Sequence, residues 1–217
     1  MPRQPRIAMG GYVYHVLNRA NNKAQIFHTK EEYDDFDALL AIAKKQFNMR
    51  ILAYVLMPNH WHLLLYPHDD QDMPNFMRWL STTHAARLRH STETVGQGHL
   101  YQGRYKSFVV DTDAYLLSAL KYIERNPARA KLVKFPEDWK WGSAYRRILG
   151  TNKERVLLSA PPTTLPYQYK KWIHEEENSE EVDNIRKSVN RGIPFGRDVF
   201  LERFNVAHSR RMRAQSQ

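Results

Sequence analysis

Residues 51–66, ILAYVLMPNHWHLLLY, form two apolar runs that are separated only by Pro58 and Asn59. The runs are rich in aliphatic and aromatic residues, and Pro-Asn favours a turn, so the stretch predicts two strands joined by a tight turn. Because side chains alternate along a strand, His60 and His62 point to one face of the sheet and Trp61 points to the other. Two neutral imidazoles that converge in this way can form half of a metal site.

This histidine pair also has an ordinary explanation. Two histidines at the start of a strand can be polar residues at a sheet edge, and a His-x-His pattern occurs by chance. The neighbouring apolar run fixes the strand, and therefore the direction in which both rings point. Whether the pair binds a metal depends on which other groups the fold brings close to it.

The composition limits the class of protein. A chain of 217 residues suits one main domain, which we expect over residues 1–150, and a basic, mostly helical extension over residues 151–217. The absence of cysteine excludes disulfides, cysteine-based zinc sites and a thiol nucleophile. Residues 1–11 lack the apolar core of a signal peptide, and no apolar run is long enough to span a membrane, so we expect a cytoplasmic protein.

The charge balance indicates a polyanionic partner. Lys and Arg number 33 against 23 Asp and Glu, which gives a formal net charge of +10 and a pI near 9.7. An excess of this size, spread along a chain with many aromatic residues, makes nucleic acid the first candidate. The alternative is that the excess of cations merely keeps the surface solvated.

The order of predicted elements gives the fold class. A strand over residues 12–17, a helix over 29–47, the strand pair, a helix over 73–89 and a strand over 107–110 follow one another. This is the order of a ferredoxin-like α+β fold, in which an antiparallel sheet packs on helices. The first and third strands lie at the centre of such a sheet, so His60 and His62 would lie mid-sheet with the helices on the opposite face.

A third helix, predicted over residues 113–125, can complete the histidine site. Helical periodicity places Tyr122 and Asn126 on one stripe at the border of the buried face, and turns Glu124 toward water. If this helix packs beside the sheet, the Tyr122 hydroxyl can reach the two histidines. Alternatively, Tyr122 is a core residue whose hydroxyl binds a neighbour, and Asn126 caps a turn that begins at Pro127.

Four separated segments together carry a family resemblance. They are YVYHVLNRANNKAQIF at 12–27, MPNHWHLLL at 57–65, GHLYQGRYKSFVVD at 98–111 and AYLLSALKYIERNPARAKLV at 114–133. In this order they resemble the REP-associated tyrosine transposases, which belong to the single-tyrosine HUH superfamily. Ala20 and the helix around residues 84–90 depart from the usual pattern of the family, which affects loop shape and DNA contacts more than chemistry.

The resemblance implies a function and a role for each site residue. The family cuts and rejoins single-stranded DNA at hairpin-forming repeats through a phosphotyrosine. By position, Tyr122 matches its nucleophile, His60 and His62 match its metal ligands, and Asn126 stands where relatives place a third ligand. Two imidazoles alone favour zinc or a late transition metal, whereas the family and the oxygen ligands point to Mg²⁺ or Mn²⁺.

The expected partner is single-stranded or hairpin DNA from repetitive extragenic palindromes, bound at the nucleoid by a monomer or a homodimer. Cations and aromatic side chains near the site or in the tail are the expected DNA contacts, although each can also be an ordinary surface charge or core ring. These residues are Arg87, Tyr101, Arg104, Tyr105, Lys106, Arg210, Arg211 and Arg213.

Two other functions remain open from the sequence. A DNA-binding protein derived from a transposase could keep the fold and the charge without cutting, although the intact His60, His62 and Tyr122 argue against it. A ferredoxin-like RNA-binding module would need exposed aromatic residues on the sheet face, where this chain has histidines instead.

Overall fold

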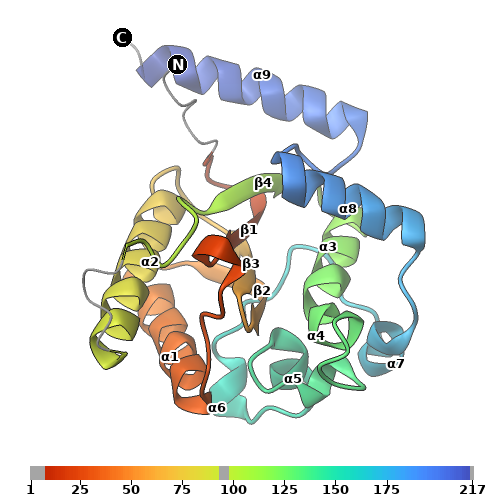
Figure 1. Ribbon diagram of the computed structural model, residues 1–217. Coiled ribbons are helices and arrows are strands. Elements are labelled where there is room, and N and C mark those ends of the chain that lie inside the picture. The colour runs from red at the N-terminus through yellow and green to blue at the C-terminus, as the bar shows by residue number, and fades with distance from the viewer. Residues whose placement is uncertain (1–7, 93–97, 216–217) are drawn as a thin grey trace.

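A four-stranded antiparallel sheet forms the centre of the computed structural model, which describes residues 8–92 and 98–215 (Figure 1). The strands are β1 (Val13–Arg19), β2 (Arg50–Met57), β3 (His60–Tyr66) and β4 (Lys106–Val110). Their order in the sheet is β2-β3-β1-β4, with β3 and β1 at the centre. This is the ferredoxin-like order, so the predicted fold class and the mid-sheet place of the histidines are confirmed.

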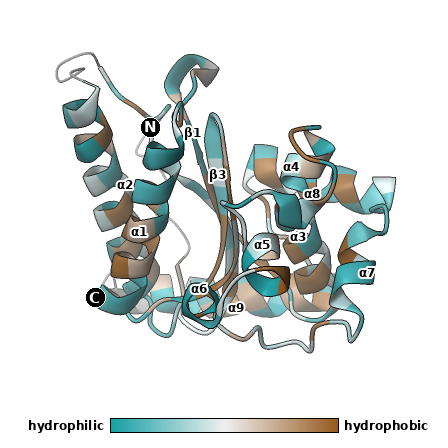
Figure 2. Ribbon diagram, turned by 90° about the horizontal axis from the view of Figure 1, so that it is seen from below, coloured by the Kyte–Doolittle hydropathy of each residue, from teal (hydrophilic) through white to brown (hydrophobic). Residues whose placement is uncertain are grey.

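Two long helices cover one face of this sheet (Figure 2). They are α1 (Lys30–Gln46) and α2 (Asp72–Ser91), and the short η1 (Asn21–Lys23) precedes them. A capping box between Thr29 and Glu32 begins α1 at the predicted place. The ring of Trp61 points from β3 into this layer and packs against Phe36, with ring centroids 5.8 Å apart. Trp61 therefore lies on the face opposite to its two histidine neighbours.

The other face of the sheet packs against α3 (Ala114–Glu124), which is followed closely by α4 (Asn126–Arg129) (Figure 2). Leu116, Leu120 and Ile123 of α3 are buried in a cluster with Val55 and Leu64 of the sheet. Shorter elements then border this layer: η2 (Pro136–Asp138), α5 (Ser143–Ile148), α6 (Asn152–Arg155) and α7 (Tyr169–His174). The packing holds the C-terminal end of α3 beside the histidine face of β3.

The C-terminal part of the chain packs onto the same sheet. Helix α8 (Ser179–Arg191) buries Ile185 in the cluster that contains α3, and Phe195 exchanges backbone hydrogen bonds with Val109 and Asp111 beside β4. Helix α9 (Asp198–Gln215) then crosses near β4, and its Phe204 is fully buried (Figure 1). Within the described residues, no helix combines the length and the apolar character that crossing a membrane requires.

Candidate active site

A groove opens on the α3 face of the sheet, where β1 ends and β3 begins. Its walls come from these strands, from the segment at 102–109, from α3 and α4, and from the end of α8. His60, His62, Tyr122 and Asn126 all line it. The structure thus brings together the four residues that the sequence singled out for the chemistry, and their roles remain predictions.

The two histidines of β3 present the same ring nitrogen to this groove. Their ring centroids are 5.1 Å apart. Nδ1 of His60 lies 2.6 Å from Oδ1 of Asn59, and Nδ1 of His62 lies 2.8 Å from Nε2 of His15. Among the described residues, neither Nε2 has a hydrogen-bond partner. With Nδ1 engaged in both rings, Nε2 is the nitrogen that remains to bind a ligand.

Both imidazoles are neutral near pH 7. Burial lowers the pKa of His60 to about 4, and the nearby Arg19 contributes to the shift. Burial also lowers the pKa of His62 well below its ordinary value, and the neighbouring His15 contributes in the same direction. A neutral imidazole has a lone pair to donate, which is the form that metal binding requires.

Tyr122 lies beside the histidines with its hydroxyl unpaired. Its ring centroid is 6.2 Å from that of His62, and the residue is 7% exposed. The hydroxyl makes no hydrogen bond to any residue that the structure describes, so it is not held by a neighbour as in an ordinary core tyrosine. The guanidinium of Arg129 lies over the ring, 4.1 Å from its centre, and is ion-paired with Glu177 at 2.7 Å. This cation–π contact helps to hold the ring in place.

Asn126 is the first residue of α4, and Arg125 holds the capping position. The side chain of Asn126 makes no capping hydrogen bond, so the structure does not support the alternative that Asn126 is a helix cap. No cluster of three or more His, Asp or Glu side chains suited to a metal occurs within the described residues. Two imidazoles and the amide oxygen of Asn126, the third ligand expected from the resemblance, would fit a divalent cation whose other ligands are phosphate or water oxygens.

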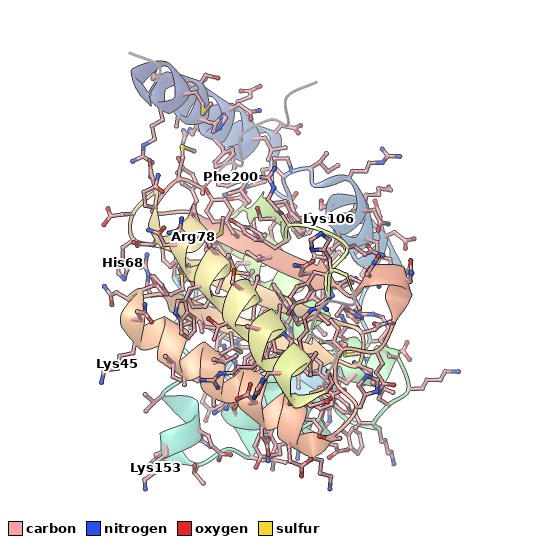
Figure 3. The ribbon with its side chains drawn as sticks, turned by 60° about the vertical axis from the view of Figure 1, so that its left-hand side comes forward. Lys45, His68, Arg78, Lys106, Lys153 and Phe200 are labelled. Carbon is pink, nitrogen blue, oxygen red and sulfur yellow. The ribbon has the colours of Figure 1, made fainter. Side chains whose placement is uncertain are left out.

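The groove is strongly basic. Its described lining contains six cationic side chains and no carboxylate: Arg19, Arg104, Lys106, Arg129, Arg186 and Arg191. Arg104 and Lys106 were expected near the site, and Lys106 lies beside α8, where its Nζ donates to the carbonyl of Asn190 at 3.2 Å (Figure 3). The other four were missed, because they come from the end of β1, from α4 and from α8. Only their proximity in space makes them one surface.

Stacking of Tyr101 on bases, expected from the sequence, is corrected by the structure, whereas stacking by Tyr105 remains a prediction. Each is only 8% exposed and belongs to the core on the α1 and α2 face. The Tyr101 hydroxyl accepts a hydrogen bond from Trp61 at 3.1 Å and lies 2.6 Å from Nδ1 of His84. The Tyr101 ring is therefore not available to unpaired bases, whereas Tyr105 borders the groove.

The remaining predicted DNA contacts lie away from the groove lining. Arg87 is on α2, on the opposite face of the sheet, and pairs with Asp35 at 2.7 Å. On α9, Arg211 pairs with Asp70 at 2.7 Å and Arg210 is exposed. Arg213 lies in the same helix, and its side chain is outside the described part of the chain. Contact of these residues with DNA remains a prediction.

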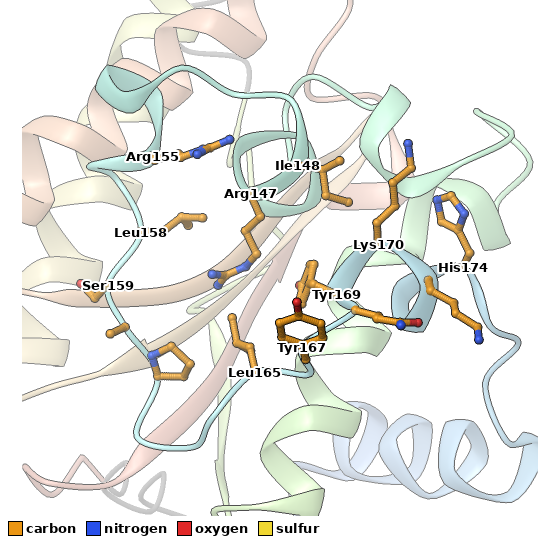
Figure 4. A pocket seen from close by; sticks show the side chains of 14 residues that line it. Arg147, Ile148, Arg155, Leu158, Ser159, Leu165, Tyr167, Tyr169, Lys170 and His174 are labelled. Carbon is orange, nitrogen blue, oxygen red and sulfur yellow. The ribbon is translucent and has the colours of Figure 1, made fainter.

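The position of Glu124 also differs from the sequence prediction: it was expected to face water, and it is instead completely buried. Its carboxylate accepts hydrogen bonds from Ser143 at 2.6 Å, from Arg147 at 3.1 Å and from Tyr169. Arg147 and Tyr169 also line a separate, largely apolar pocket between α5 and α7 (Figure 4). That pocket contains neither the histidine pair nor Tyr122. Glu124 thus fixes the end of α3, two residues from Tyr122, from outside the groove.

Comparison with known proteins agrees with this arrangement. A family described as "Transposase IS200 like" matches residues 8–126. The REP-associated tyrosine transposase of Escherichia coli (strain K12) is 23% identical over 140 residues, which cover 64% of this chain and 79% of that protein. A solved REP-associated tyrosine transposase, bound to a REP hairpin, superposes with a TM-score of 0.56. It is 18% identical, and the match covers 82% of this chain and 100% of that one, so it supports the fold.

The family match spans more than half of the chain and includes His60, His62, Tyr122 and Asn126. The resemblance to REP-associated tyrosine transposases, first indicated by four sequence segments, is confirmed by the curated relative and by the superposition. The chain belongs to the IS200-like transposase family.

Proposed function

We propose that the protein cuts and rejoins single-stranded DNA at hairpin-forming repeats, through a covalent bond between Tyr122 and a 5′ phosphate. The observation that carries this proposal is the unpaired Tyr122 hydroxyl, in a groove that holds two neutral histidines and no described carboxylate. Tyrosine suits the reaction because its phenolate is both a good nucleophile and a good leaving group. The hairpin as partner is supported by the solved relative, which is bound to a REP hairpin.

The reaction is a transesterification at phosphorus. Tyr122 loses its phenol proton to solvent as its oxygen attacks the scissile phosphate, a new O–P bond forms, and the bond from phosphorus to the 3′ oxygen breaks. The departing strand leaves with a 3′ hydroxyl, which takes up a proton. Attack by a 3′ hydroxyl on the phosphotyrosine restores a phosphodiester and the free phenol, so that rejoining needs no ATP.

Each part of the groove has a role in this reaction. His60, His62 and Asn126 would hold Mg²⁺ or Mn²⁺, which, when bound, polarises a phosphoryl oxygen and neutralises charge on the phosphate. Arg129, stacked on the Tyr122 ring, orients the phenol through a cation–π contact. The other groove cations bind the phosphates on either side of the scissile bond. Low exposure of Tyr122 keeps competing water away from the phosphotyrosine.

One chain carries all of these groups, which supports a site that is complete in a monomer. To test this, His60→Ala and Tyr122→Phe are assayed separately and as a mixture. We expect no recovery of cleavage in the mixture, since each subunit has one defective site. Recovery would mean that a dimer combines the histidines of one subunit with the tyrosine of the other.

The direct test uses a labelled single-stranded DNA that contains a repeat hairpin and its flanks, incubated with the protein and Mn²⁺. We expect a protein–DNA adduct that survives denaturation, and its loss in Tyr122→Phe. Tyr101→Phe is the matched control, because that tyrosine is buried on the other face of the sheet. Binding without any adduct in the wild-type protein would support a non-cutting DNA-binding protein instead.

A further inference from the structure

His15 is a third histidine, which contacts His62 without lining the groove itself, and none of the roles described so far uses it. It lies on the central strand β1 and is completely buried. In the register of β1 and β3 it stands opposite Leu64, which places it diagonally next to His62 on the same face. The ring of Phe108 from β4 packs against it, with centroids 4.8 Å apart. The position of its ring is therefore fixed by three strands of the sheet.

The contact between His15 and His62 admits two arrangements of protons. Nε2 of His15 is 2.8 Å from Nδ1 of His62, and a neutral pair has only one proton between these two atoms. In the first arrangement, His62 donates from Nδ1 and its Nε2 is a bare acceptor that faces the groove. In the second, His15 donates from Nε2, and the proton of His62 lies on its own Nε2. Only the first arrangement lets His62 bind a cation.

The charges of the groove select the first arrangement. Arg19 and Arg129 line the same groove as His62. A lone pair directed at these guanidinium groups is favoured, whereas an N–H directed at them is repelled. On the other side, Nδ1 of His15 is buried without a partner among the described residues, so either arrangement leaves one unpaired atom there. The buried side of His15 therefore favours neither proton arrangement strongly, and the charges of the groove determine which one forms.

We infer that His15 is a positioning residue for the proposed metal site. Its Nε2 accepts the Nδ1–H of His62, holds the ring plane, and keeps the Nε2 lone pair of His62 directed into the groove. Asn59 does the same for His60 through its Oδ1. The inference rests on the metal-binding part of the proposed function, and its first test needs neither metal nor DNA.

The first test is the tautomer of His62 in the metal-free protein, measured by two-bond ¹H–¹⁵N NMR correlation with ¹⁵N-labelled histidine. We expect the proton of His62 on Nδ1 in the wild type. A proton on Nε2 of His62 would overturn the inference, because the ring would then be held in the form that cannot bind a cation. This measurement reports on the wild-type fold, so it stands even if a variant fails to fold.

The second test is the affinity for Mn²⁺ of three variants, measured by calorimetry on the full chain. His15→Phe fills the same space but cannot accept a hydrogen bond, and we expect it to weaken Mn²⁺ binding by about 10- to 100-fold. In His15→Gln, the amide oxygen can accept in place of Nε2, and we expect an affinity within about threefold of wild type. His84→Phe replaces a buried neutral histidine on the other face, and it should leave the affinity unchanged.

The outcomes separate the two proposals. Equal Mn²⁺ affinity in His15→Phe and wild type, with both proteins folded, would overturn the positioning role while the proposed function stands. A wild type that binds no Mn²⁺ yet keeps the Nδ1–H tautomer would overturn the metal assignment, and the tautomer itself would support the role of His15 in orienting His62.

Discussion

Strand β3 carries adjacent residues into two contrasting surroundings. On the α3 face, His60 and His62 reach a groove with unpaired ring nitrogens and an unpaired Tyr122 hydroxyl. On the α1 and α2 face, Trp61 joins Tyr101 and His84 in a hydrogen-bonded cluster that is closed to solvent. Both faces thus hold a neutral buried histidine near a tyrosine, and only one is open. Residue type and burial therefore do not distinguish the proposed site from the closed cluster. The distinguishing features are the groove, the unpaired polar atoms and the surrounding cations.

The largest contrast between the two faces should come from removing one tyrosine hydroxyl on each. Tyr122→Phe should abolish the covalent adduct, because no other group replaces the nucleophile. Tyr101→Phe should keep the adduct and lower the free energy of unfolding by about 1 to 3 kcal/mol, because Trp61 and His84 lose a buried partner. Denaturing gels and urea unfolding measure the two effects. An adduct of wild-type yield in Tyr122→Phe would refute this assignment.

Removing the metal should distinguish histidine variants on the two faces almost as strongly as the tyrosine variants do. A chelator should reduce adduct formation to background, and added Mn²⁺ should restore it, since His60, His62 and Asn126 are the proposed ligands. Adduct formation by His62→Ala should not increase when Mn²⁺ is added. His84→Ala should keep the Mn²⁺ response and lose about 2 kcal/mol of stability, because it leaves a cavity in a sealed core. Cleavage that is undiminished after chelation would contradict the metal role.

Acid should lower stability through buried histidines on both faces, because their burial sets this response. Burial lowers the pKa of His15 and of His84 to about 3, against about 6.5 in the unfolded chain. The unfolded chain therefore binds more protons below pH 6.5, and the free energy of unfolding falls as the pH is lowered from 6.5 toward 3. At pH 5 each of these two histidines lowers the free energy of unfolding by about 2 kcal/mol relative to neutral pH. Urea unfolding of His84→Phe at pH 7 and 5 should show a smaller loss than wild type, and an equal loss would contradict the burial argument.

The smallest expected effect concerns the cation above the nucleophile. Arg129→Ala should slow adduct formation by about fivefold, which corresponds to about 1 kcal/mol of lost cation–π stabilisation. Glu177→Gln should have a weaker effect, because it removes only the ion-pair partner of Arg129. Single-turnover rates at saturating DNA separate this effect from weaker binding. An unchanged rate in Arg129→Ala would remove this residue from the mechanism.

The sequence predicted the open face better than the closed one, for physical reasons. Alternation along β3 is a local property, so the directions of His60, Trp61 and His62 followed from the chain alone. The stripe that carries Tyr122 and Asn126 followed in the same way from the period of α3. The order of strands and helices then sufficed for the ferredoxin-like fold.

Properties that depend on distant partners could not be predicted in this way. Glu124 was expected in water, but Ser143, Arg147 and Tyr169, which bury it, come from later segments. Tyr101 follows a polar stretch of sequence and was expected to stack on bases. In the structure its hydroxyl is hydrogen-bonded with Trp61 and His84, which come from other elements. His15 lies within an ordinary apolar strand, and its importance depends on the neighbouring strand in the sheet.

The most direct measurement is mass spectrometry of the purified protein–DNA adduct after digestion with nuclease and protease. The chain has 12 tyrosines, and Tyr122 is the one that lies beside the histidine pair with no hydrogen bond from its hydroxyl to the described residues. We predict a phosphonucleotide on the peptide that contains Tyr122, formed only when a divalent metal ion is present. A modification on any other tyrosine, or an adduct that forms equally well without metal, would contradict the proposed chemistry.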